Sequence, residues 1–237
     1  AECDFEFKGV VPFFEQKKAK DSDIDRAVEL IDKAQRPYIY IGGGAAGAGM
    51  TEDIKALAEK IDGYIGCSFM GLSALPNSYE RFLGMEGMHG QYASSMANKE
   101  ADLVIGIGVS FSDRATGNTK KYSKNTKFVQ LDTDLSALNK NIIVDIGVVG
   151  DIVSSLSRIL ERCKEQKHPE WNETVNGFKA KAEEISLKAE VDAGDVLTPK
   201  KVFKVINEIK DKDTVIATDV GQHQMWTAQY VDFEKPR

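Results

Sequence analysis

The chain contains little cysteine, and its cysteines are not arranged for cross-linking or metal binding. Cys3, Cys67 and Cys163 are the three cysteines among 237 residues, and no C-x-x-C pair or His-paired spacing occurs. The sequence therefore predicts neither a disulfide framework nor a zinc site, and we expect no metal ligands in this chain. Scattered free cysteines are typical of a reducing compartment, so we expect a cytoplasmic protein.

Two further features are missing, namely an excess of positive charge and a long apolar run. The net charge is -6 at pH 7, whereas nucleic acids and anionic membranes are bound by clustered Lys and Arg. No apolar run approaches the length of a membrane span, and no signal-peptide pattern is visible. We therefore expect neither a nucleic acid nor a membrane as partner. The 42% apolar and 29% charged content is ordinary for a soluble globular protein.

Both ends of the sequence indicate a piece of a longer protein. The chain begins at Ala1, without an initiator Met, and ends at Pro236-Arg237, soon after a new strand–helix unit has begun. Residues 1–20 lack a sustained period and contain Pro12, which predicts a linker. We expect one α/β domain over residues 21–165, a helical linker over 166–195, and the start of a second domain over 196–237.

Short apolar segments alternate with amphipathic ones along the first domain. The pattern predicts strands over residues 38–41, 64–69, 102–107, 127–131 and 142–149, with a further strand over 214–217. Helices are predicted over residues 24–31, 51–61, 91–99, 152–163 and 169 to about 190, and again from Pro199 and from Gln222. Residues 71–90 are predicted to be a polar, Gly-rich connection. Nearly continuous apolar strands that alternate with helices indicate an α/β fold with a Rossmann-like parallel sheet covered by helices on both faces.

A Gly-rich turn follows the first predicted strand. Gly42, Gly44 and Gly47 satisfy G-x-G-x-x-G between a strand and a helix, which is the context of a dinucleotide fingerprint. An ordinary NAD site also has an acid at the end of the second strand. That strand ends in Cys67-Ser68-Phe69, and Asp62 precedes it. The turn is thus a candidate nucleotide site that departs from the NAD pattern, and the alternative is a turn required only for close packing.

The most informative stretch covers residues 87–117, where a Gly turn leads through a helix and an apolar strand to a second Gly turn. His89 has no acid–base partner nearby in sequence, so we interpret it as a residue lining a planar ligand, whereas Met88 could line a ring or pack in the core. Asp113 and Arg114 follow the strand over 102–107. The Arg fork suits a diphosphate, and the alternative is a silent surface ion pair.

Three acids and one helix start complete the candidates. Asp132 and Asp134 follow a strand, and either could accept a ribose hydroxyl, or Asp134 could cap the next helix. Asp151 has the same two interpretations. Gln222-His223-Gln224 opens a helix directly after a Gly, which suits a second anionic ligand, although an ordinary helix start is the preferred interpretation of this pattern taken by itself.

Taken together, these segments resemble the large subunit of acetolactate synthase (acetohydroxyacid synthase), a thiamine-diphosphate enzyme of branched-chain amino acid biosynthesis. The resemblance covers nearly the whole chain, and T-D-V-G-Q-H-Q-M-W is its most specific string. The matching segments are G-G-G at 42–44, S-F-M-G at 68–71, G-M-H-G at 87–90, F-S-D-R-A-T-G at 111–117 and T-D-V-G-Q-H-Q-M-W at 218–226. The loop with Asp113 and Arg114 resembles the FAD-binding branch of the family.

The resemblance implies that residues 21–165 are the central, FAD-binding domain and that residues 196–237 begin the thiamine-diphosphate-binding domain. It implies that Gln222, His223 and Gln224 border thiamine diphosphate. The FAD contacts that it implies are Gly42, Gly43, Gly44, Ser68, Phe69, Met70, Met88, His89, Gly108, Asp113, Arg114, Asp132 and Asp151.

The chain also departs from the family pattern. Relatives often have G-A-R-F-D-D-R where this chain has G-V-S-F-S-D-R, so Ser110 stands where an Arg faces FAD and one ionic contact is lost. The glutamate that activates thiamine and the G-D-G motif that holds Mg2+ are not found in this chain. We therefore expect no catalytic residue here and no catalysis by this chain alone.

The implied activity of the parent protein is the condensation of two pyruvates to 2-acetolactate, or of pyruvate and 2-oxobutyrate to 2-aceto-2-hydroxybutyrate, with release of CO2. The resemblance also implies a homo-oligomer, dimer or tetramer, and a regulatory small subunit as a partner. Two alternatives stay open. One is another thiamine-dependent enzyme, such as glyoxylate carboligase or an oxidase, and the other is a flavin- or nucleotide-binding module without chemistry.

Overall fold

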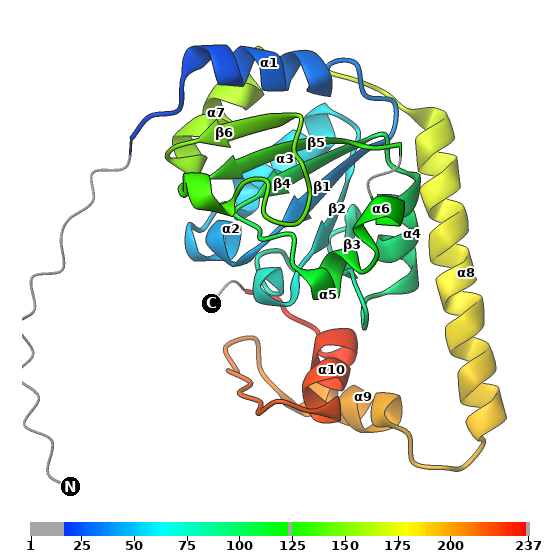
Figure 1. Cartoon of the computed structure of the whole chain (residues 1–237). Coiled ribbons are helices and arrows are strands. Elements are labelled where there is room, and N and C mark those ends of the chain that lie inside the picture. Colours follow the sequence, from blue (N-terminus) through cyan, green and yellow to red (C-terminus); the bar gives the residue numbers. More distant parts are fainter. Residues whose placement is uncertain (1–16, 123–124, 236–237) are drawn as a thin grey trace, which may run out of the picture.

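A single parallel sheet organises the computed structural model of the chain, which describes residues 17–122 and 125–235 (Figure 1). The expected linker over residues 1–20 therefore lies almost entirely outside the described residues. The strand order is β3-β2-β1-β4-β5-β6, and every neighbouring pair is parallel. The strands are β1 (Pro37–Ile41), β2 (Tyr64–Cys67), β3 (Phe82–Met85), β4 (Leu103–Ile107), β5 (Lys127–Asp132) and β6 (Ile146–Val149). The predicted α/β class is confirmed.

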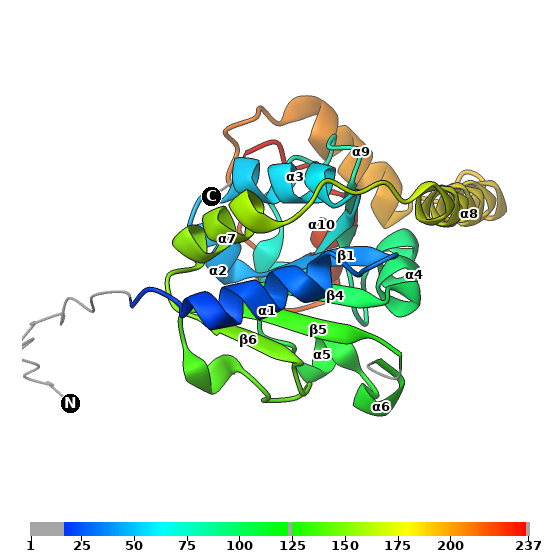
Figure 2. The same cartoon turned by 90° about the horizontal axis from the view of Figure 1, so that it is seen from above.

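Helices cover both faces of this sheet, because alternate side chains of a strand point to opposite faces. Ile39 and Ile41 of β1 join one core cluster with α1 (Asp21–Ile31), α3 (Thr51–Lys60) and α7 (Ile152–Arg162). Tyr38 and Tyr40 join a second cluster with α4 (Tyr92–Glu100) and the start of α8 (Pro169–Ala193). Figure 2 shows α3 and α7 on one side of the sheet and α6 (Thr119–Tyr122) on the other.

Helix α8 packs on this side of the sheet along its first half, where Phe178 and Ala182 follow the two fully buried residues. Its buried residues are Trp171 and Val175, in the first two turns, and the indole N–H of Trp171 donates to the Pro37 carbonyl at 3.2 Å. The remainder of α8 runs past the sheet edge toward α9 (Pro199–Ile209) and α10 (Gln222–Tyr230) (Figure 1). Thr198 caps α9, because its hydroxyl accepts the Lys201 N–H ahead of Pro199.

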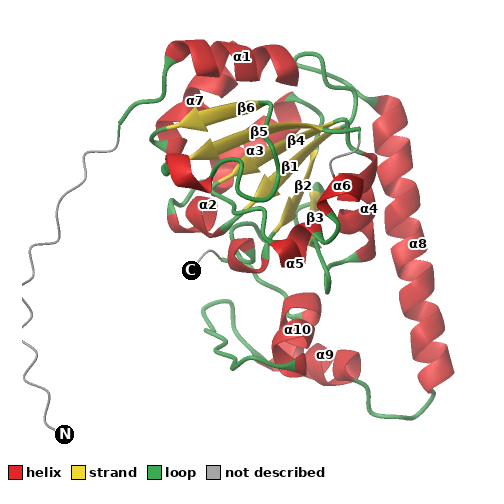
Figure 3. Ribbon diagram, in the orientation of Figure 1, coloured by secondary structure: helices red, strands yellow, loops and turns green. Residues whose placement is uncertain are grey.

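Two sequence-based predictions of strands need correction. The connection over residues 71–90 contains β3, a strand of four residues that occupies one edge of the sheet. Residues 214–217 form no strand and belong to the loop between α9 and α10 (Figure 3). Val215 in that loop is 90% exposed. A strand is stabilised by a paired neighbour, and none of the described strands lies beside this segment.

None of the helices in residues 17–122 and 125–235 combines the length and the apolar character needed to cross a lipid bilayer.

Candidate functional site

A large pocket lies at the carboxyl ends of the strands, where the strand order reverses between β1 and β4. In open α/β sheets, ligands bind in the crevice outside the strand ends at this switch point. The pocket volume is about 760 Å³, within the usual range for small-molecule and cofactor sites. Its walls are the segments that follow β1, β2, β3 and β4, together with the start of α10.

The Gly-rich turn after β1 is shaped by close packing on the segment after β4. A Cβ on Gly42 would lie 2.3 Å from the Gly108 carbonyl oxygen, and one on Gly44 would lie 2.9 Å from the Gly108 Cα. The Gly44 N–H donates to that same carbonyl oxygen at 3.0 Å. Close packing therefore explains why glycine stands at positions 42 and 44. Gly43 lines the pocket, and a Cβ on this residue would lie 3.1 Å from the Met70 Cβ.

The two ends of the 87–117 stretch meet in space. The Met88 N–H donates to the Arg114 carbonyl at 3.1 Å, and a Cβ on Gly87, whose φ is +106°, would lie 2.9 Å from that same oxygen. Met88, His89 and Arg114 all line the pocket. The Asp113 carboxylate accepts the backbone N–H of Arg114 at 3.0 Å, and no ion pair joins these two side chains in the described structure. The Arg114 guanidinium is therefore not held by Asp113.

Helix α10 closes the pocket opposite the sheet. The Gln229 side chain donates to the His89 carbonyl, and the Gln91 side chain donates to the Gln229 carbonyl, both at 2.9 Å. These reciprocal bonds hold α10 against the loop that carries His89. Gln222 and Gln224 line the pocket, whereas His223 does not.

Most of the predicted contact residues thus meet at one place, but several do not. Those that line the pocket are Gly43, Gly44, Ser68, Phe69, Met70, Met88, His89, Gly108, Arg114, Gln222 and Gln224. Those outside its lining are Gly42, Asp113, Asp132, Asp151 and His223.

The acids at the ends of β5 and β6 accept hydrogen bonds from backbone N–H groups. The Asp134 carboxylate accepts the Ser136 N–H at 2.8 Å, and Asp151 accepts the Ser154 N–H at 2.6 Å. Both are therefore helix caps, which was one of the two interpretations of each. Asp132 accepts the Asp134 N–H at 3.1 Å.

Sequence reasoning missed several residues of the pocket, among them two buried polar ones, Tyr40 and Glu86. Both are buried, with 0% and 5% of their surface exposed, yet both contribute to the lining. The Glu86 carboxylate accepts hydrogen bonds from the Asn98 amide and, at 2.8 Å, from the Tyr122 hydroxyl. The Tyr40 hydroxyl has no hydrogen-bond partner in the described structure. The signal for Glu86 was a charged residue directly after an apolar run and before G-M-H-G.

Burial governs the protonation of Glu86. It raises the pKa of this carboxyl to about 7, although the hydrogen bonds from Tyr122, Asn98 and Tyr38 oppose the shift. Burial, together with the nearby Glu86 carboxylate, also raises the pKa of Tyr40 far above its ordinary value, so this hydroxyl keeps its proton.

Metal ligands do not cluster in the part of the chain that the structure describes. No group of three or more His, Cys, Asp or Glu side chains in residues 17–122 and 125–235 is placed to hold a metal ion.

The comparisons with known proteins agree on one family. The family model for the central domain of thiamine pyrophosphate enzymes matches residues 24–159. The chain is 36% identical over 226 residues to the acetolactate synthase large subunit of Lactococcus lactis (strain IL1403), which covers 95% of this chain and 39% of that protein. It is 34% identical over 221 residues to the acetolactate synthase isozyme 3 large subunit of Escherichia coli (strain K12), which covers 90% of this chain and 38% of that protein.

A third relative shows the same partial coverage. The acetolactate synthase large subunit of Corynebacterium glutamicum is 36% identical over 219 residues, which is 90% of this chain and 34% of that protein. The chain thus spans between 34% and 39% of the length of these relatives. Since the family model matches more than half of the chain, the chain belongs to the thiamine pyrophosphate enzymes, and residues 24–159 are their central domain.

Proposed function

We propose that this chain is part of the large subunit of an acetolactate synthase and that its pocket binds FAD. The parent protein would join two pyruvates to 2-acetolactate, or pyruvate and 2-oxobutyrate to 2-aceto-2-hydroxybutyrate, with release of CO2. The observation that carries the proposal is the pocket at the switch point between β1 and β4. Most residues that the resemblance assigns to FAD line this one cavity.

The residues present fit a flavin dinucleotide. Phe69, Met70 and Met88 are 39%, 52% and 72% exposed, and all three line the pocket, so apolar surface is available to a planar ring. Arg114 offers a planar fork of donors to a phosphate group. FAD would have a structural role here, because the resemblance to acetolactate synthase implies a flavin that takes part in no net redox step. The assignments of Gly42, Asp113, Asp132 and Asp151 to FAD stay predictions, and each would contact a part of the dinucleotide beyond this pocket.

The same chain would border the second cofactor. Gln222 and Gln224 line the pocket at the start of α10, and their amide side chains carry donors and acceptors, which supports a place for this helix next to thiamine diphosphate. When bound, thiamine diphosphate supplies the electron sink that decarboxylation of a 2-oxo acid requires. The proposal places Mg2+ in parts of the longer protein that hold the diphosphate.

The assembly and location are proposals of the same kind. The relatives are named large subunits, which supports a regulatory small subunit as a partner of this protein. We further propose a cytoplasmic homo-oligomer. In it, residues 21–165 form the central domain, 166–195 connect it onward, and 196–237 begin the thiamine-diphosphate-binding domain.

Product analysis of the full-length protein tests the proposed reaction. With pyruvate as the sole substrate, thiamine diphosphate, Mg2+ and FAD, we expect CO2 and 2-acetolactate. The control is glyoxylate as the sole substrate, for which we expect no product. Carboligation of glyoxylate without turnover of pyruvate would assign the protein to the glyoxylate carboligases instead. Flavin binding without turnover of either acid would indicate a flavin-binding module without chemistry.

Replacing Ser110 by arginine is expected to tighten FAD binding about tenfold, because a new charge-assisted hydrogen bond to a phosphate is worth about 1.5 kcal/mol or more. Ser110 is exposed on the pocket lining, so the longer side chain has room. Equilibrium titration with FAD measures the change. The matched control is Ser110→Gln, which has a long polar side chain without the charge, and whose effect should be small. Equal affinity of the arginine and glutamine variants would contradict the account of this loop.

A further inference from the structure

The wall of the pocket that α10 supplies is anchored unevenly. The α10 residues on the pocket lining belong to its first half and are Gln222, Gln224 and Met225. Val220, just before the helix, also lines the pocket and is 82% exposed. The two buried residues of α10, Thr227 and Ala228, lie in its second half. One end of the helix is thus packed on the protein, whereas the end that faces the ligand space is open to solvent.

Two glutamine side chains join the second half of α10 to the loop after β3. The Gln229 amide donates to the His89 carbonyl, and the Gln91 amide donates to the Gln229 carbonyl, both at 2.9 Å. Gln91 is itself fixed by its neighbours. Its N–H donates to the Met85 carbonyl at 2.7 Å, and its side chain lies over Gly84, where a Cβ would be 2.9 Å from the Gln91 Cγ. Gln91 and Gln229, below called the glutamine pair, therefore connect α10 to a segment that also lines the pocket.

The chain is tethered to the central domain directly after α10. The Asn77 side chain donates to the Val231 carbonyl at 3.3 Å, and the Asn77 N–H donates to the Phe233 carbonyl at 2.9 Å. A helix of nine residues with two buried side chains opens at a low cost in free energy. Moving α10 away from the pocket would break the bonds of the glutamine pair and leave this tether in place.

We propose that Gln91 and Gln229 are positioning residues that hold α10 as a movable wall of the pocket, and that bound FAD completes the docking of this helix. The inference rests on the proposed binding of FAD in the pocket. A ligand that fills the pocket contacts the loops after the strands on one side and the first half of α10 on the other. It therefore binds the docked form more tightly than the undocked form and increases the population of the docked form.

The size of this coupling follows from mass action. Free FAD at a hundred times its Kd favours the docked form by a further factor of about one hundred. In the other direction, each hydrogen bond of the glutamine pair that is removed lowers the docking constant about fivefold. FAD then binds to a smaller docked fraction, so its measured Kd rises. The glutamine pair thus contributes to FAD affinity without contacting FAD.

Hydrogen exchange of the 237-residue chain, measured by mass spectrometry with and without FAD, tests the coupling. Without FAD, we expect the amides of α10 to exchange faster than those of β4, because α10 opens while the sheet stays folded. With free FAD at about a hundred times its Kd, exchange in α10 should slow about a hundredfold. Residues 185–193, in the part of α8 that extends past the sheet, are the control. Their exchange should not change, because they do not line the pocket.

Two substitutions test the glutamine pair itself. Q91M and Q229M keep the length of the side chain but remove the donated hydrogen bond. Q229M also keeps the helix propensity, and Gln91 makes no side-chain cap bond that Q91M would remove. We expect α10 in each variant to exchange about fivefold faster without FAD, and the double variant to bind FAD about tenfold more weakly.

The matched control is Q166M. The Gln166 side chain also donates to a backbone carbonyl of a distant segment, that of Ile31 at 3.1 Å, but Gln166 lies outside the pocket lining. Its FAD affinity and its α10 exchange should match those of the wild type.

The outcomes separate this inference from the proposed function. Exchange of α10 at the rate of β4, or exchange that FAD does not slow, would overturn the inference and leave the proposed FAD site standing. A double variant that binds FAD as the wild type does, or an equal loss in Q166M, would also overturn it. If the double variant is unfolded by circular dichroism, the single variants and the wild-type exchange decide the question. A folded wild-type chain that binds no FAD would overturn the proposed function itself, and this inference with it.

Discussion

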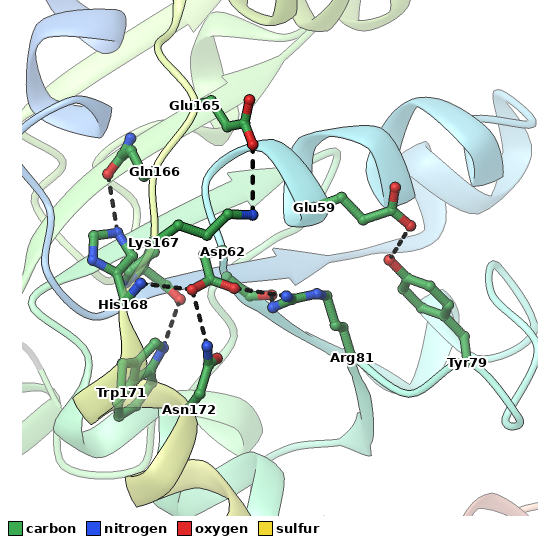
Figure 4. Close-up of polar contacts among 12 residues, drawn as sticks. Glu59, Asp62, Tyr79, Arg81, Glu165, Gln166, Lys167, His168, Trp171 and Asn172 are labelled. Atoms are coloured by element: carbon green, nitrogen blue, oxygen red, sulfur yellow. Dashed lines mark hydrogen bonds and ion pairs between the residues drawn. The ribbon is translucent and has the colours of Figure 1, made fainter.

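Replacing Asp62 by alanine is expected to lower the free energy of unfolding by about 3–5 kcal/mol, the usual cost of removing one partner from a buried ion pair. The Asp62 side chain is 3% exposed, and one of its oxygens accepts from Arg81 at 2.6 Å. The other accepts from the His168 N–H at 2.6 Å and from the Asn172 amide at 2.9 Å (Figure 4). Denaturant unfolding followed by circular dichroism measures the loss.

The reason for so large an effect is the position of Asp62 between separate parts of the chain. Asp62 follows α3, Arg81 precedes β3, and His168 and Asn172 belong to the start of α8. A carboxylate at this end of α8 also complements the helix dipole. Removing it leaves three buried or half-buried donors without their acceptor. The control Asp62→Asn separates charge from conformation, since Asn also tolerates the φ of +50° found here. This variant should lose less of the free energy of unfolding than the alanine variant does.

The pH dependence of stability gives an independent check of the Asp62 cluster. Burial opposes ionisation, but the hydrogen bonds from His168, Arg81 and Asn172, together with the charge of Arg81, outweigh it and hold the pKa of Asp62 below its ordinary value. Stabilisation by this group is thus present above the unfolded pKa of about 3.9 and is lost as the pH falls through the lower, folded pKa. Acid unfolding of Asp62→Asn should show a weaker pH dependence in that range. Identical acid profiles for wild type and variant would contradict this account.

Replacing Gly43 by leucine is expected to weaken FAD binding about a hundredfold, because a side chain forced into a packed site costs about 1–3 kcal/mol. Gly43 lines the pocket, and a Cβ there would already lie 3.1 Å from the Met70 Cβ. The added side chain therefore takes up space that the proposed ligand requires. Fluorescence titration with FAD measures the change.

Gly47 provides a matched control within the same short helix, α2 (Gly43–Gly47). A Cβ on Gly47 meets nothing within 4 Å, and the residue is outside the pocket lining. Gly47→Leu should therefore bind FAD as the wild type does. Equal losses in the two variants would show that helix α2, rather than the pocket, was disturbed.

Much of the fold could be predicted from sequence because local patterns and tertiary packing agree. The strands of residues 38–41 and 102–107 read as apolar runs, and both are central in the sheet, where burial on two faces demands such runs. β3 was missed because it has four residues, one of them a glycine with φ of +83°, in a polar neighbourhood. The opposite error, at residues 214–217, arose because β propensity alone cannot supply a partner strand.

The site shows the same division. Gly43, His89 and Arg114 follow strands or Gly turns, and the topology of parallel sheets brings such positions together. Tyr40 and Glu86 could not be found in this way, because one resembles a core residue and the other a solvated acid until the packing around them is known. Asp62 was considered only as a missing ribose contact. Its partners at Arg81, His168 and Asn172 are distant in sequence, and only the fold brings them to it.

Binding of FAD to the purified chain tests the central claim most directly. We predict that the folded wild-type chain binds one FAD, with a perturbed flavin absorption spectrum. Gly43→Leu should abolish most of this binding, and Gly47→Leu should leave it intact. Two results would contradict the assignment of the pocket between β1 and β4 as the flavin site. One is a wild-type chain that is folded by circular dichroism yet binds no FAD. The other is a Gly43→Leu variant that binds FAD as tightly as the wild type does.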